Sequence, residues 1–172
     1  QIYELAKEMG NDWNIYIDSD ALVCPDLPDV TSHLDKSTVA HNASDMASVR
    51  WTYDHYFLRD GRNIAGGNWF AAASDWCLDL WRPLDDLTPE EAIARILPTV
   101  DERIFRLEAS HLIDDYTTSR NIARYGLKFI TLRELWAKLG IPGAEPFSHA
   151  YLASTAQKVA NHKQKLKEWG LI

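Results

Sequence analysis

The chain has 172 residues, of which 46% are hydrophobic, so it can bury a sizeable core, and its length fits a single domain over residues 1–172. Its net charge of −7 comes from 25 acidic and 18 basic residues and argues against nucleic-acid binding, which depends on an excess of Lys and Arg. Cys24 and Cys77 lack the spacing of a disulfide framework or a zinc site, which favours a reducing, cytoplasmic location. No apolar run approaches the ~20 residues of a membrane-spanning helix.

The first predicted elements are a helix over residues 2–9, which ends at Gly10, and an apolar strand over residues 13–17. A helix that leads into a strand, with no strand before it, is typical of the middle of an α/β domain. We therefore expect an N-terminal nucleotide-binding segment to be missing, with another chain or segment supplying that half. Leu5 or Met9 should then pack against the edge of the sheet or against that chain.

The later elements alternate between strands and helices, which predicts an α/β fold with an open, mostly parallel sheet and flanking helices. Further strands are expected at residues 38–41, 63–73 and 127–132. Helices are expected at residues 74–81, 89–97, 100–112, 114–125, 132–139 and 154–169. The clearest local signals are Thr88 as an N-cap with Pro89 at the first helical position, and Gly126 as a C-cap.

Two carboxylates follow the first strand, in the order Asp18-Ser19-Asp20. Alternate residues of an extended chain point the same way, so both carboxylates can reach one ligand at the strand's end. Oxygen ligands of this kind suit Mg²⁺ or Mn²⁺. The alternative is a turn in which Asp and Ser bond their own backbone. Because the apolar residues 21–23 follow at once, we favour a site where Asp18 and Asp20 bind one Mn²⁺ or Mg²⁺.

A second group is Gly66-Gly67-Asn68-Trp69, within the strand expected at residues 63–73. Glycines inside a strand mark either a bulge or a place where a ligand or another backbone comes close. Asn68 and Trp69 would offer such a ligand an amide and an aromatic plane. Tight packing against a helix explains the glycines equally well.

Two further candidates lie later in the chain. Asp114 and Asp115 stand at an expected helix start, where acids favour the helix dipole, but one of them could instead bind a sugar hydroxyl or act in catalysis. His149 lies in a loop after the last strand, and a lone His is usually structural. It becomes a candidate ligand if an oxygen-rich metal site accepts one nitrogen.

The order of these four groups resembles that of nucleotide-sugar-dependent glycosyltransferases of the GT-A fold. The resemblance extends from Trp13 to Tyr151 and implies that Asp18, Asp20 and His149 hold Mn²⁺ or Mg²⁺ on the diphosphate of a UDP- or GDP-sugar. That family has a nucleotide-binding segment ahead of its Asp-x-Asp motif, whereas a short stretch precedes the motif here. The resemblance therefore implies the C-terminal portion of such an enzyme.

The same resemblance assigns the remaining candidates. It implies that donor and acceptor sugars lie beside Gly66, Gly67, Asn68 and Trp69, and that Asp114 or Asp115 acts in catalysis. Asp115 is the favoured general base toward the acceptor hydroxyl. A cation near the phosphates would stabilise the leaving group, and the sequence offers Arg120, Arg124 and Lys128.

Two other classes remain open. In phosphohydrolases resembling the haloacid dehalogenase superfamily, Asp18 would be a nucleophile, Asp20 an acid/base and Asp114-Asp115 a metal-binding pair. The match is poorer, because Ala-Leu-Val follows Asp20 where that family has Gly and then Thr or Val. A non-catalytic carbohydrate-binding module would use the seven Trp and seven Tyr for stacking on sugars. The sugar, the base, the acceptor and the stereochemical outcome stay open.

Overall fold

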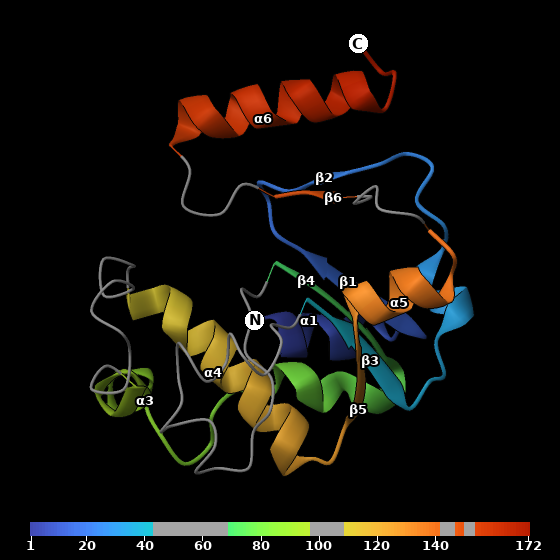
Figure 1. The fold of residues 1–172 in the computed structure, drawn as a ribbon. Coiled ribbons are helices and arrows are strands. Elements are labelled where there is room, and N and C mark those ends of the chain that lie inside the picture. Colours follow the sequence, from blue (N-terminus) through green and yellow to red (C-terminus); the bar gives the residue numbers. More distant parts are fainter. Residues whose placement is uncertain (43–68, 97–108, 142–146, 150–153) are drawn as a thin grey trace.

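The computed structural model describes residues 1–42, 69–96, 109–141, 147–149 and 154–172 (Figure 1). The candidates Gly66, Gly67 and Asn68 lie outside the described residues. The strands are β1 (Trp13–Ile17), β2 (Leu22–Val23), β3 (Thr38–His41), β4 (Phe70–Ser74), β5 (Lys128–Thr131) and β6 (Phe147–Ser148). The helices are α1 (Ile2–Met9), η1 (Val30–His33), η2 (Asp75–Trp81), α3 (Pro89–Ile96), α4 (Ala109–Arg124), α5 (Leu132–Lys138) and α6 (Thr155–Glu168).

The described strands form a four-stranded mixed sheet in the order β1-β4-β3-β5, and β2 pairs separately with β6. Strand β4 is antiparallel to both β1 and β3, and the pairing of β3 with β5 is parallel. The fold is therefore α/β, as predicted, but the sheet is mixed and the expected mostly parallel sheet is wrong. Helices η2, α3 and α4 connect β4 to β5, which run in opposite directions, so alternation of helices and strands did not imply parallel neighbours.

The core lies on both faces of the sheet, and β4 contributes to each. Alternate residues of β4 point to opposite faces, and its five residues are all buried. On one face the buried cluster joins the sheet to η2 and α4 and comprises Val39, Ala71, Ala73, Cys77, Leu80, Trp81 and Ile122. On the other face the cluster joins the sheet to α5 and β6 and comprises Val30, Ala40, Phe70, Ala72, Leu132, Leu135 and Phe147.

The local signals at the helix ends are confirmed. Gly10 adopts the left-handed conformation at the end of α1, with φ of 63°. The hydroxyl of Ser74 accepts a hydrogen bond from the Trp76 backbone at the start of η2. Thr88 accepts a hydrogen bond from the Glu91 backbone at the start of α3, and the Glu91 carboxylate accepts one from the Thr88 backbone. These contacts depend on neighbours in sequence, which is why local patterns predict them.

A capping box also starts α5. The Thr131 hydroxyl accepts a hydrogen bond from the Glu134 backbone N–H at 3.1 Å, and the Glu134 carboxylate accepts one from the Thr131 backbone at 2.8 Å. We expect Thr131→Ala to lower the free energy of unfolding by about 1 kcal/mol, because an amide of the first turn loses its partner. Urea titration followed by far-UV circular dichroism measures this change. Thr131→Ser keeps the acceptor oxygen and should stay near the wild type; equal losses in both variants would contradict the capping role.

The sequence prediction for α4 is wrong in one respect. A break was expected between helices at residues 100–112 and 114–125, but α4 continues from Ala109 to Arg124. Asp114 and Asp115 therefore lie inside a helix and not at its start. Asp114 is exposed, so its position inside the helix does not bury the residue.

Helix α1 packs on η2, with Ala6 buried and Tyr3 against the core cluster. Leu5 and Met9 are 56% and 59% exposed, so the expected packing of either on the sheet is not found. None of the described helices is long and apolar enough to cross a membrane.

Candidate metal centre

Asp18 and Asp20 lie in a turn between β1 and β2. The Ala21 backbone N–H donates to the Asp18 carbonyl at 3.0 Å, and the Ser19 N–H donates to Asp18 Oδ1 at 3.0 Å. The backbone of residues 18–21 therefore forms the turn that the sequence analysis gave as an alternative. Strand alternation was the wrong reason to expect the two carboxylates together. The turn itself brings them together, and the remaining Asp18 oxygen, Oδ2, stays free of that local hydrogen bond.

The pairing of β2 with β6 brings His149 to this turn. Leu22 stands opposite Ser148 in the antiparallel register, so His149, which directly follows β6, comes beside the residues that precede Leu22. The His149 ring stacks on Trp69, with centroids 5.5 Å apart and planes inclined by 12°. Trp69 in turn accepts a hydrogen bond on its carbonyl from the Asp18 N–H at 2.8 Å. Two separate contacts thus hold His149 at the Asp18 turn.

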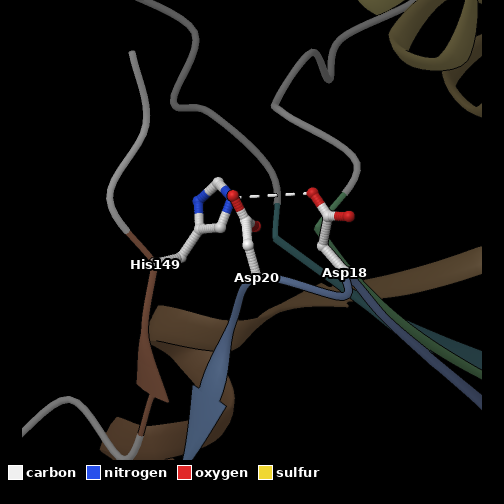
Figure 2. Close-up of side chains that lie close together, drawn as sticks. All are labelled: Asp18, Asp20 and His149. Atoms are coloured by element: carbon white, nitrogen blue, oxygen red, sulfur yellow. Dashed lines mark ion pairs between the residues drawn. The ribbon is translucent and has the colours of Figure 1, made fainter. Parts of the chain in front are cut away.

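The three predicted ligands lie together, as Figure 2 shows. His149 Nε2 is 3.3 Å from Asp20 Oδ1 and 3.6 Å from Asp18 Oδ2. One ligand atom from each residue falls within 4.8 Å of the others. Two ligand atoms of an octahedral ion with bonds of about 2.1 Å lie roughly 3 to 4 Å apart. The distances from His149 Nε2 to the two carboxylate oxygens therefore fit one shared divalent cation.

An orphaned oxygen supports this fit. Asp20 Oδ1 is buried and has no hydrogen-bond partner among the residues that the structure describes, although His149 Nε2 lies 3.3 Å away. A buried carboxylate oxygen without a partner is costly, and a bound cation would satisfy it. Two oxygens and one imidazole nitrogen form a ligand set that suits Mn²⁺. The set also suits Mg²⁺, but the nitrogen contributes less to the affinity for this harder ion.

Helix α6 supplies two further residues to the site, and the sequence analysis missed both. Lys158 forms an ion pair with Asp20 Oδ2. His162 Nε2 lies 2.9 Å from the Asp20 carbonyl, and its Nδ1 lies 3.1 Å from the Ser148 hydroxyl. The two residues are four positions apart and so share one helix face, but nothing in the sequence connects that face to Asp20.

Electrostatics at the site follow from these contacts. The hydrogen bond from Lys158 is the main reason that the pKa of Asp20 lies below its usual range, and charge from His149 and Lys158 adds to it against the effect of burial. Burial raises the pKa of Tyr16, and the charges of Asp18, Asp114 and Asp20 raise it further. The charge of Asp114 thus affects the pKa of the same tyrosine as the two carboxylates of the turn.

Other predicted residues lie elsewhere or are not described. The Asp115 side chain lies outside the described part. Arg120 pairs with Asp86, and Arg124 pairs with Asp85, so both arginines serve a contact between α4 and the loop before α3. Lys128 is exposed on β5. Among the described residues, Lys158 is the lysine that the structure places at the Asp18-Asp20 turn.

Comparison with known proteins returned no match to this chain, whether among family models, curated proteins or solved structures. The geometry of the site and the chemistry of its side chains therefore carry the functional argument.

Proposed function

We propose that the chain functions as a metal-dependent glycosyltransferase of the GT-A type, which moves a sugar from a nucleotide-diphosphate donor to an acceptor hydroxyl. The convergence of Asp18, Asp20 and His149 around a buried carboxylate oxygen, which has no hydrogen-bond partner in the described part of the chain, carries this proposal. The donor would be a UDP- or GDP-sugar. The cytoplasmic location belongs with this proposal and rests on the sequence alone, in which Cys24 and Cys77 lack the spacing of a disulfide framework.

The chain's own residues define what the site can do. Asp18 and Asp20 would hold Mn²⁺ or Mg²⁺ through oxygen, and His149 through Nε2, with Trp69 keeping the imidazole in place. A divalent cation bound there supplies Lewis-acid stabilisation of the negative charge on the leaving diphosphate. Lys158 adds a positive charge beside Asp20 and is better placed than Arg120 or Arg124 to meet phosphate oxygens.

Acceptor activation would require a general base, for which Asp114 and Asp115 stay the proposed residues. One observation supports Asp114, because its negative charge raises the pKa of Tyr16, as do the charges of Asp18 and Asp20. Asp115 occupies the next position on α4 and rests on the sequence alone.

The competing functions are less well supported. A nucleophilic Asp18 would need a free carboxylate oxygen facing substrate, whereas its Oδ2 faces His149 Nε2 at 3.6 Å beside Asp20. That arrangement favours a ligand over a nucleophile. A sugar-stacking role for Trp69 is weakened because His149 already covers one face of its indole ring.

Isothermal titration with UDP and GDP tests the proposal. We expect one of the nucleotides to bind when Mn²⁺ is present and to lose measurable binding when EDTA removes the metal. Mg²⁺-dependent hydrolysis of p-nitrophenyl phosphate would instead support the phosphohydrolase. Binding of simple sugars that survives EDTA would support the carbohydrate-binding module.

A further inference from the structure

His162 connects two segments of the proposed metal site. The Asp20 carbonyl can only accept a hydrogen bond, so the His162 Nε2 at 2.9 Å must carry the hydrogen. In the neutral ring, Nδ1 then accepts from the Ser148 hydroxyl at 3.1 Å. Both ring nitrogens are therefore hydrogen-bonded, Nε2 to Asp20 and Nδ1 to Ser148. These two contacts determine that the neutral ring carries its hydrogen on Nε2.

The two segments are those that carry the metal ligands. Asp20 is itself a ligand, and Ser148 directly precedes His149. The two hydrogen bonds of His162 are not part of the hydrophobic core, because helix α6 has no buried residue. Figure 1 shows α6 lying along the β2–β6 pair, away from α3 and α4, and α6 contacts β6.

We infer that His162 is a positioning residue of the metal centre, which sets the separation of Asp20 and His149 without binding the ion itself. The inference rests on the metal site of the proposed function. Partners outside the ligand set orient the ligands, and their loss typically lowers metal affinity by about 10–100-fold. The histidine would act on both ligand segments at once, which a residue on either segment alone could not do.

Lys158 provides a matched contrast on the same face of α6. Its ammonium group pairs with Asp20 Oδ2, so it competes with a cation for that carboxylate. Lys158→Met keeps the length of the side chain but removes the charge. If α6 acted only as a cover, loss of either contact would weaken metal binding. A positioning His162 and a competing Lys158 instead predict opposite changes.

The experiment is calorimetric titration of the full chain with MnCl2. His162→Ala should weaken Mn²⁺ binding by about 10–100-fold, while His33→Ala, an exposed histidine on η1, should bind like the wild type. Asn mimics Nδ1 and can still accept from Ser148, and Gln mimics Nε2 and can still donate to Asp20. His162→Asn and His162→Gln should each recover part of the loss, and Lys158→Met should bind Mn²⁺ more tightly than the wild type.

The outcomes separate this inference from the proposed function. A wild-type chain that binds no Mn²⁺ overturns the metal site and the inference with it. Wild-type binding with unchanged affinity in His162→Ala overturns the inference alone. The inference is also overturned if Lys158→Met loses as much Mn²⁺ affinity as His162→Ala. It is overturned as well if neither His162→Asn nor His162→Gln recovers any of the affinity that His162→Ala loses. Urea titration without metal gives the unfolding midpoint of each variant, and we expect His162→Ala to leave it unchanged because α6 buries no residue.

Discussion

Replacing Asp20 by Asn should lower the affinity for Mn²⁺ by more than about 100-fold, because a ligand carboxylate matters at least as much as the outer partners whose loss costs 10–100-fold. The substitution keeps the size of the side chain but removes the negative charge and leaves a weaker amide oxygen. Titration of the chain with MnCl2 measures the change. Asp18→Asn should show the same direction of change, since Asp18 Oδ2 faces the same His149 nitrogen.

Asp26→Asn is the matched control, because Asp26 is exposed in the loop after β2 and lies outside the metal cluster. The Asp20 side chain is 35% exposed, so its replacement should leave the fold intact and the loss should not reflect unfolding. Affinities equal to that of the wild type in both Asp20→Asn and Asp18→Asn would rule out the turn as a metal site.

Phe70→Ala should lower the free energy of unfolding by about 3–5 kcal/mol, the usual cost of removing a buried phenyl ring and leaving a cavity. Phe70 is 1% exposed and packs against Phe147, with ring centroids 5.1 Å apart. Since folded domains are stable by about 5–15 kcal/mol, this loss is a large share of the total. Urea titration followed by tryptophan fluorescence and far-UV circular dichroism measures it.

Ile15→Ala is the control for Phe70→Ala. Ile15 is 47% exposed on β1, so its truncation should cost less than about 1 kcal/mol. If Phe70→Ala does not fold, Phe70→Leu keeps much of the volume and should show a smaller loss in the same direction. A loss below about 1 kcal/mol in Phe70→Ala would contradict the packing of β4 against β6.

Local structure was largely predictable because its causes lie within a few residues. The left-handed turn at Gly10 and the cap at Thr88 depend on backbone geometry and hydrogen bonds between close neighbours. The failures also have local causes. The acids at positions 114 and 115 resemble a helix start, but both positions lie inside α4, and the Asp18-Asp20 pair follows the strand in a turn.

The chemistry of the metal centre was readable from residue types. Asp18, Asp20 and His149 supply carboxylate oxygens and an imidazole nitrogen wherever the fold places them, so the sequence by itself indicated which kind of ion the proposed site would suit. It also determined the α/β class, through the alternation of strands and helices. The direction of the strands was not determined, because the same alternation serves parallel and antiparallel neighbours.

Only the tertiary structure decided which residues meet at the site. The antiparallel register of β2 with β6 brings His149 to the turn, and the docking of α6 brings Lys158 and His162, which are 138 and 142 positions from Asp20. Contacts over such separations leave no local signal, because they arise from strand pairing and helix docking after long loops have closed. The sequence therefore supplied the side-chain chemistry of the candidate site, and the tertiary structure determined which residues surround Asp18, Asp20 and His149.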